Sequence, residues 1–134
     1  MNKYLSIPIA AMIAVAGYSS SAVASPTVDA IKARDAVLCG GNGSRPGFSA
    51  LDSKGQWTGM DVDTCKAIAA AVLGDSNKVQ FVKLTSQTRF TALQTGEVDM
   101  LARHVTWTLS RDTELALDFV APTFYVGQGF MVNK

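Results

Sequence analysis

The 134-residue sequence has little cysteine and histidine and no excess of charge of one sign. Its 12 basic and 11 acidic residues offer no positive surface for a nucleic acid and no basic cluster for an anionic membrane. One histidine and two cysteines without a Cys-x-x-Cys spacing disfavour a zinc site. Internal repeats and low-complexity tracts are also lacking. We therefore expect one globular domain that binds no nucleic acid, metal or other cofactor.

The first 24 residues have the pattern of a secretory signal peptide. Lys3 precedes an apolar core at residues 7–16, and Ala22-Val23-Ala24 provides an Ala-x-Ala cleavage site. The core is short for a membrane span, which needs ~20 apolar residues, and no later stretch approaches that length. We expect cleavage after Ala24, which leaves residues 25–134 as a mature domain outside the cytoplasm. An uncleaved membrane anchor is the alternative.

Hydrophobic periodicity predicts alternating strands and helices in the mature chain. Strands are predicted at residues 36–40, 79–84, 97–101 and 127–132, with a hairpin and its four-residue turn at 48–60. Helices are predicted at residues 29–34, from Asp61 or Asp63 to Gly74, from Thr85 or Ser86 to Gly96, and from Ser110 onward. Strands that alternate with helices predict an α/β fold, with a mostly parallel sheet and helices on both faces.

The two cysteines both lie in the predicted mature domain. Cys39 ends a predicted strand, and Cys65 falls near the start of the clearest helix. An even pair in an oxidising compartment favours a disulfide, and closing a loop of this length stabilises a chain by roughly 3–4 kcal/mol. A metal site shared with the single histidine is the weaker alternative.

Residues 103–112 join a predicted buried strand to a predicted helix start. Ser110 suits the N-cap position, and Asp112 and Glu114 suit a first helical turn. Free backbone N–H groups at such a junction favour an anion, and Arg111 adds a planar fork that can grip a carboxylate. We therefore predict that this junction binds the carboxylate of a small ligand. Alternatively, Arg111 pairs with Asp112 or Glu114 on the surface.

Three motifs occur in order at residues 59–69 (GMDVDTCKAIA), 90–99 (FTALQTGEVD) and 106–111 (TWTLSR). Together they resemble the periplasmic solute-binding proteins of polar amino-acid ABC transporters. The resemblance is greatest to the general L-amino-acid-binding branch, in which both cysteines also occur. It extends over about residues 28–134 and implies a type II periplasmic-binding fold, in which two α/β lobes close over the ligand.

The resemblance also implies roles for individual residues. Arg111 is implied to grip the α-carboxylate of the ligand with help from the hydroxyl and backbone of Thr106. Ser86 and Arg89 match a Ser-x-x-Arg motif, whose arginine meets the acidic side chain of the ligand in glutamate/aspartate-binding relatives. For Arg89, a solvated helix residue is the alternative reading.

Two further positions are implied to line the pocket. His104 falls where related proteins have a small hydroxyl residue, and Phe48 matches an aromatic-rich loop that packs against the ligand. From the residues alone, His104 could instead be a partly buried imidazole that is hydrogen-bonded to the backbone. Phe48 could equally be a core residue.

Members of the family resembled are considerably longer than this sequence. Their chain leaves the first lobe near a strand like residues 127–132, builds a second lobe and then returns. The resemblance thus implies that residues 25–134 form the first lobe, truncated at the hinge, with the second lobe absent. That lobe is expected to supply the acidic residue for the α-amino group, so the chain alone is expected to lack full binding.

The sequence therefore predicts a binding protein rather than an enzyme. It is expected to capture polar or acidic L-amino acids in the periplasm and to deliver them to the membrane permease of an ABC importer. A periplasmic dehydratase of the same fold, acting on prephenate or arogenate with His104 as acid or base, is one alternative. The ligand-binding domain of a sensor is another. The preferred amino acid and the oligomeric state are left open.

Overall fold

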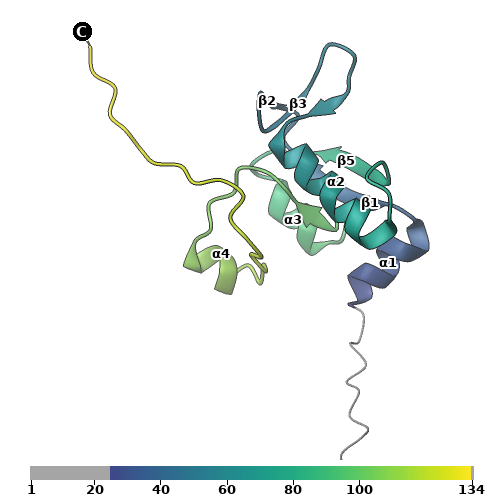
Figure 1. The fold of residues 1–134 in the computed structure, drawn as a ribbon. Helices are drawn as coiled ribbons and strands as arrows, with labels where there is room; N and C mark the ends of the chain where they lie inside the picture. Colours follow the sequence, from purple (N-terminus) through teal and green to yellow (C-terminus); the bar gives the residue numbers. More distant parts are fainter. Residues whose placement is uncertain (1–24, 134) are drawn as a thin grey trace, which may run out of the picture.

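A computed structural model of the chain describes residues 25–133, and the expected signal peptide at residues 1–24 lies outside the described residues. At its centre is a three-stranded parallel sheet (Figure 1). The middle strand is β1 (Val37–Gly41), which pairs with β5 (Val79–Lys83) on one side and β6 (Met100–Leu101) on the other. The predicted parallel pairing is confirmed.

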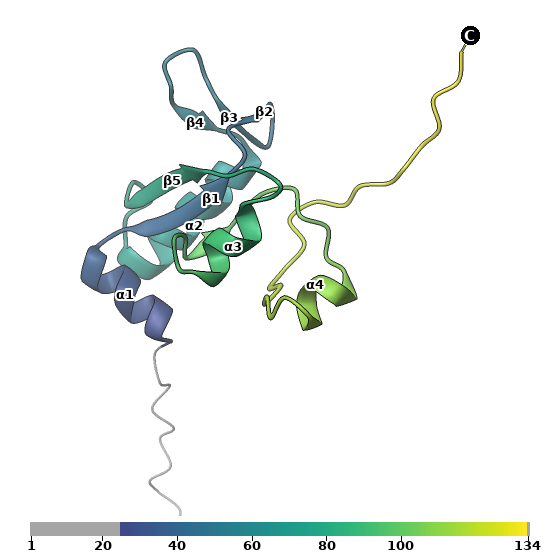
Figure 2. The same cartoon turned by 180° about the vertical axis from the view of Figure 1, so that it is seen from behind.

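Helices cover both faces of this sheet, because alternate residues of β1 point to opposite sides. The helices are α1 (Pro26–Arg34), α2 (Met60–Leu73) and α3 (Arg89–Gln94). On one face Val37 packs with Ile31 of α1 and Ala69 of α2. On the other face Leu38 packs against the cluster that contains Ala92 of α3. Figures 1 and 2 show α2 and α3 on opposite sides of the sheet, so this prediction of the α/β fold is also confirmed.

A disulfide joins Cys39 of β1 to Cys65 of α2, as predicted. Both residues are fully buried, and Ala102 packs in the same cluster. The bond therefore ties the central strand to the longest helix from inside the core. The end of α2 also follows the prediction, since Gly74 takes the left-handed conformation at its C-cap (φ 75°).

The predicted hairpin is part of a small antiparallel sheet beside the parallel one. Its strands are β2 (Ser44–Arg45), β3 (Ser49–Leu51) and β4 (Trp57–Thr58). The side chain of Asp52 stabilises the turn between β3 and β4, because one carboxylate oxygen accepts the N–H groups of Lys54 and Gln56, each at 2.8 Å. Strand β2 was not predicted, since its two residues lie in a glycine-rich stretch.

The N-cap of α2 is Gly59, so the prediction that Asp61 or Asp63 caps this helix is wrong. Gly59 has a φ of 117°, and a Cβ atom there would lie 2.3 Å from the carbonyl oxygen of Phe48. That same oxygen accepts the N–H of Asp61 at 2.9 Å. The backbone of the loop before β3 thus accepts a hydrogen bond from the first turn of α2. The loop lies so close to residue 59 that only glycine fits at this position.

Helix α3 begins at Arg89, later than the predicted cap at Thr85 or Ser86. The hydroxyl of Thr85 accepts the N–H groups of Gln87 at 3.3 Å and Thr88 at 3.1 Å. Thr85 therefore closes a turn that precedes the helix, and α3 itself starts only after that turn.

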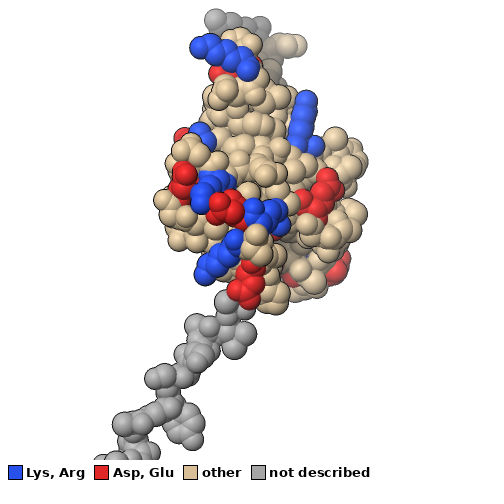
Figure 3. Space-filling model, turned by 90° about the vertical axis from the view of Figure 1, so that its right-hand side faces the viewer, with Lys and Arg blue, Asp and Glu red and all other residues tan. Residues whose placement is uncertain are grey.

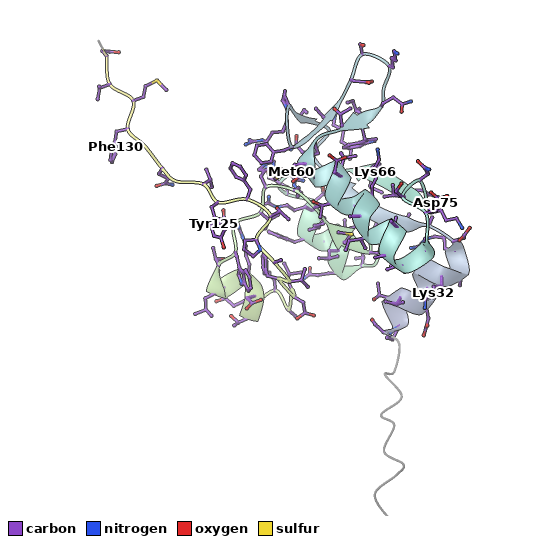
Figure 4. The ribbon with its side chains drawn as sticks, viewed as in Figure 1. Lys32, Met60, Lys66, Asp75, Tyr125 and Phe130 are labelled. Atoms are coloured by element: carbon purple, nitrogen blue, oxygen red, sulfur yellow. A yellow bond between two sulfur atoms is a disulfide. The ribbon has the colours of Figure 1, made fainter. Side chains whose placement is uncertain are left out.

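Residues 115–133 form neither helix nor strand, so the predicted strand at residues 127–132 is wrong. Tyr125 and Phe130 lie on a segment that leads away from the helices and the sheet (Figure 4). They are 84% and 103% exposed. A strand forms only beside a partner, and no strand among the described residues lies beside this segment.

Candidate ligand-binding site

The carboxyl ends of β1, β5 and β6 meet at one edge of the parallel sheet, and arginines gather there. They are Arg45, Arg89, Arg103 and Arg111. Three of them, Arg45, Arg89 and Arg103, lie close enough to His104 to lower the pKa of its imidazole. Ligands of open α/β sheets bind beyond the carboxyl ends of the strands. This edge is therefore the candidate site, and its charge favours an anion.

Arg111 lies in α4 (Leu109–Thr113), a helix of five residues. Its N-cap is Thr108, whose extended backbone precedes the helix and whose hydroxyl accepts the N–H of Arg111 at 3.4 Å. The predicted N-cap Ser110 is therefore wrong, since it lies inside the helix. So short a helix has a weak dipole, which leaves the guanidinium as the main attraction for an anion at this junction.

The guanidinium of Arg111 is held at the edge of the sheet by two contacts. Its Nη1 donates to the carbonyl oxygen of Thr106 at 2.7 Å, and its Cζ lies 5.4 Å from the centre of the Phe90 ring. The Cζ of Arg89 lies 4.6 Å from the same ring. Phe90 therefore gathers two cations that come from different helices, α3 and α4.

Arg111 does not pair with a neighbouring acid, so the alternative of a surface pair with Asp112 or Glu114 is not observed. The two ion pairs among the described residues are Arg34–Asp99 and Lys78–Asp35. Both lie at the other end of the sheet, where the strands begin. Figure 3 shows the side of the molecule on which α1 lies, with basic and acidic side chains next to one another.

Arg89 is buried, with 8% of its surface exposed, which excludes the alternative of a solvated helix residue. Its Nη1 donates to the carbonyl oxygen of His104 at 3.3 Å, whereas its buried Nε has no partner among the described residues. Burial lowers the pKa of Arg89, and the charge of Arg111 lowers it further. The arginine stays protonated, so a positive charge is held here against the cost of desolvation.

Arg103 is a buried arginine that the sequence did not single out as a site residue. Its Nη1 donates to the carbonyl oxygens of Leu84 at 2.7 Å and Thr85 at 2.9 Å. Its Nε and Nη2 are buried without a partner in the described part of the chain. Burial lowers its pKa, as does the charge of Arg89. Its place directly after a buried strand was the available sequence signal.

His104 follows Arg103 and is half-buried. Its Nδ1 is buried and has no partner among residues 25–133, so this nitrogen does not make the backbone hydrogen bond that the alternative reading required. Burial lowers the pKa of the imidazole most, followed by the charges of Arg45, Arg103 and Arg89. His104 is therefore neutral at pH 7.

Asp61 is the one buried acid that the structure brings to this edge among the described residues. Burial raises the pKa of its carboxyl, although a hydrogen bond from Ser49 and the charges of Arg103 and Arg45 act in the opposite direction. Its Oδ2 has no partner among the described residues, and it forms no ion pair with either arginine. One carboxylate thus faces several guanidinium groups.

Residues 37–134 match the model of the bacterial extracellular solute-binding proteins, family 3. The chain belongs to this family. It is 57% identical over 122 residues to the glutamate/glutamine/aspartate/asparagine-binding protein BztA of Rhodobacter capsulatus. It is 48% identical over 133 residues to the general L-amino acid-binding periplasmic protein AapJ of Rhizobium johnstonii. These matches span 91% and 99% of the chain but only 36% and 38% of the two relatives.

A solved structure also supports this family assignment and identifies the fold. The periplasmic binding protein of Brucella ovis with glutathione bound has 50% sequence identity and a TM-score of 0.69. The match covers 71% of this chain and 30% of that one. The fold is therefore part of a type II periplasmic-binding lobe, as the sequence predicted.

The remaining two predicted site residues, Ser86 and Phe48, lie on loops around the same edge of the parallel sheet. Ser86 is exposed in the turn before α3. Phe48 is half-buried, and its ring meets that of Phe124 edge-on with centres 5.1 Å apart. The ring of Trp107 instead stacks nearly parallel on that of Phe119, with centres 5.4 Å apart. Two aromatic contacts thus hold the beginning of the C-terminal segment near the site.

A hollow of about 400 Å³ lies elsewhere, between α1 and α3. Its charged side chains, Arg34 and Asp99, are paired with each other. In residues 25–133, no group of three or more histidine, cysteine or acidic side chains is arranged to hold a metal, and no helix is long and apolar enough to cross a membrane. The arginine-rich edge is therefore the best candidate site.

Proposed function

We propose that this chain is the first lobe of a periplasmic receptor that captures polar or acidic L-amino acids for an ABC importer. The guanidinium of Arg111 carries the proposal. It lies at the ligand edge of the sheet beside Thr106 and Arg89, and no acid among the described residues neutralises it. A guanidinium binds a carboxylate through two parallel, charge-assisted hydrogen bonds, and every amino acid has an α-carboxylate.

In this proposal Arg111 and Thr106 bind the α-carboxylate. Ser86, Arg89, His104 and Phe48 line the rest of the pocket. The names of the relatives support an amino-acid ligand, since BztA is named for glutamate, glutamine, aspartate and asparagine. The glutathione in the Brucella ovis structure supports the same anchoring group, because a γ-glutamyl peptide also has a free α-amino and α-carboxylate end.

The proposed mechanism is closure of a second lobe over the ligand, followed by delivery to a membrane permease. Residues 1–24 would direct export, and residues 25–134 would form the lobe up to the hinge. The Cys39–Cys65 disulfide supports an oxidising compartment such as the periplasm. A single lobe provides only part of the contacts of a closed cleft, so we expect it to bind amino acids weakly.

Replacement of Arg111 by alanine tests the proposed site. The change is expected to weaken amino-acid binding by more than about 2 kcal/mol, because it removes a charge-assisted pair. Chemical-shift titration of the purified, disulfide-bonded chain with glutamate measures the affinity even when it is weak. Lys32→Ala on α1 is the control for loss of one positive charge. Unchanged affinity in the Arg111 variant would contradict the proposal.

We infer binding rather than catalysis, because both curated relatives named above are binding proteins. The dehydratase alternative needs His104 to transfer protons, and its neutral imidazole is chemically able to do so. An assay with prephenate and arogenate separates the two functions. Turnover by the chain that disappears in a His104→Gln variant would replace the binding proposal with an enzymatic one.

A further inference from the structure

Asp61 is a buried acid that does not cap its helix and forms no ion pair with any of the described residues. It lies in the first turn of α2 and is 3% exposed, and its Oδ2 has no partner in this part of the chain. Burial of a carboxylate is costly, because it removes the water that would solvate the charge. Aspartates are rarely buried without a paired cation, which indicates a role other than stability for Asp61.

The carboxylate of Asp61 is connected to the end of the central strand through a serine. It accepts a hydrogen bond from the hydroxyl of Ser49, which is 1% exposed. The oxygen of that hydroxyl accepts the N–H of Asn42 at 3.0 Å, and Asn42 is the first residue after β1. We call these two hydrogen bonds the Ser49 bridge. Because Asp61 takes the hydroxyl proton, a lone pair of the Ser49 oxygen is left to face Asn42.

The Ser49 bridge holds one end of residues 42–48, which leave the sheet at the ligand edge. Backbone hydrogen bonds hold the other end, since the carbonyl oxygens of Gly47 and Phe48 accept the N–H groups of Met60 and Asp61 at 3.0 Å and 2.9 Å. Both ends of this segment are thus attached to the start of α2. The second attachment uses backbone groups alone, whereas the first depends on two side chains.

Residues 42–48 carry two groups that belong to the candidate site. Arg45 lies close enough to Arg103 and His104 to lower the pKa of both side chains. Phe48 contacts Phe124 at the beginning of the C-terminal segment. The segment therefore forms one wall of the site, and a contact that fixes the segment also fixes this wall.

We propose that Asp61 is a positioning residue for ligand binding, which acts through Ser49 on residues 42–48 and does not touch the ligand. The inference rests on the proposed function, since it concerns how the same site is held ready. A segment that is ordered before the ligand arrives does not reduce affinity through the entropy cost of ordering it. Arg111 binds the carboxylate that amino acids share, whereas Asp61 sets the wall that carries Phe48.

Affinity for glutamate tests the Ser49 bridge, by chemical-shift titration of the purified, disulfide-bonded chain. Ser49→Ala changes no charge and is expected to weaken binding about tenfold, because the bridge is lost. Asp61→Ala and Asp61→Asn remove the same charge, but the amide oxygen of asparagine still accepts a hydrogen bond from Ser49. Asp61→Asn is therefore expected to bind glutamate about tenfold more tightly than Asp61→Ala.

Two exposed residues provide matched controls. Ser53→Ala in the turn between β3 and β4 and Asp63→Ala on α2 are expected to leave the affinity unchanged. The double variant Ser49→Ala, Asp61→Ala is expected to bind no more weakly than Asp61→Ala, because a bridge broken at one point is already lost. Losses that add in the double variant would overturn the inference, and so would equal affinities of Asp61→Asn and Asp61→Ala.

Amide hydrogen exchange separates positioning from a general loss of stability. The N–H of Asn42 belongs to the Ser49 bridge, whereas the N–H of Leu84 donates to the carbonyl oxygen of Gly41 at 2.9 Å at the same end of the sheet. Ser49→Ala is expected to speed exchange at Asn42 and to leave Leu84 unchanged. If both amides exchange faster by the same factor, Ser49 and Asp61 only stabilise the fold and the inference is overturned.

Failure of this inference is distinct from failure of the proposed function. If the unaltered chain binds glutamate and Arg111→Ala weakens it, but Ser49→Ala and Asp61→Ala bind as the unaltered chain does, the inference is wrong and the proposed function stands. If the unaltered chain does not bind glutamate, the proposed function itself is contradicted, and the inference with it.

Discussion

Charged side chains are paired at one end of the parallel sheet and largely unpaired at the other. Where the strands begin, Arg34 pairs with Asp99 and Lys78 pairs with Asp35. Where they end, four arginines and a neutral histidine gather near one buried aspartate, and no ion pair is formed there among the described residues. The beginning of the sheet is built for stability, whereas its end retains unpaired charge that a ligand can use. Such a division is expected when binding and stability compete for the same fold.

The largest expected effect tests the scaffold that both ends share. The Cys39→Ala, Cys65→Ala double variant is expected to lower the free energy of unfolding by about 3–4 kcal/mol, since the bond closes a loop with a sequence separation of 26. Urea denaturation followed by circular dichroism measures the change. A loss below about 1 kcal/mol would mean that the disulfide adds little to the packing of β1 against α2.

The next effect is specific to the beginning of the sheet. Asp99 accepts the N–H of Leu38 at 2.7 Å as well as a hydrogen bond from Arg34. Asp99→Ala is expected to lower the free energy of unfolding by about 2 kcal/mol, because it leaves a backbone donor and an arginine unpaired. Urea denaturation again provides the measurement, and Asp35→Ala is the matched control because its pair is exposed. Equal effects of the two changes would contradict the comparison.

Removal of a charge at the opposite end should behave differently. Arg89→Met keeps an unbranched side chain over Phe90 but removes a buried cation that Arg111 repels. The free energy of unfolding is expected to stay the same or to rise by up to about 1 kcal/mol, while affinity for acidic amino acids falls. Denaturation and ligand titration of the same variant measure both quantities. A clear loss of stability would show that Arg89 is structural.

The smallest effect concerns pH. Because burial and three arginines lower the pKa of His104, the unfolded chain takes up a proton before the folded chain does. Stability is therefore expected to fall as pH drops from about 7.5 to about 5.5, around the pKa of a free imidazole. The fall should be smaller in His104→Gln. The raised pKa of Asp61 acts in the opposite direction, and it is present in both proteins. Identical pH profiles would contradict the assignment.

Much of the architecture was accessible from short-range patterns. The alternation of residues in β1 and the order of helices and strands predicted a parallel sheet with helices on both faces. The presence of two cysteines in an expected oxidising compartment predicted the disulfide. The helix starts were predicted less well, because the carbonyl of Phe48 approaches α2 and the turn closed by Thr85 delays α3. These contacts come from segments whose position a local pattern does not encode.

The candidate site was predicted in part. Its motifs indicated Arg111, Thr106 and Arg89. The structure brings the Cζ atoms of Arg89 and Arg111 to 4.6 Å and 5.4 Å from the centre of the Phe90 ring. Arg103 was missed because an arginine after a strand usually extends into solvent. Its burial depends on the carbonyl groups of Leu84 and Thr85, which belong to a different strand and loop.

The sequence by itself determined the class of fold, the disulfide and the junction at which Arg111 lies, because each depends on spacing along the chain. Only the tertiary structure decided which charges are neutralised. An arginine next to an acid in space is a structural pair, and an arginine without one is a candidate for binding, yet the two are identical in sequence. The physical reason is that desolvation and Coulomb interactions depend on distance in three dimensions, which here is set by strands that are far apart in the chain.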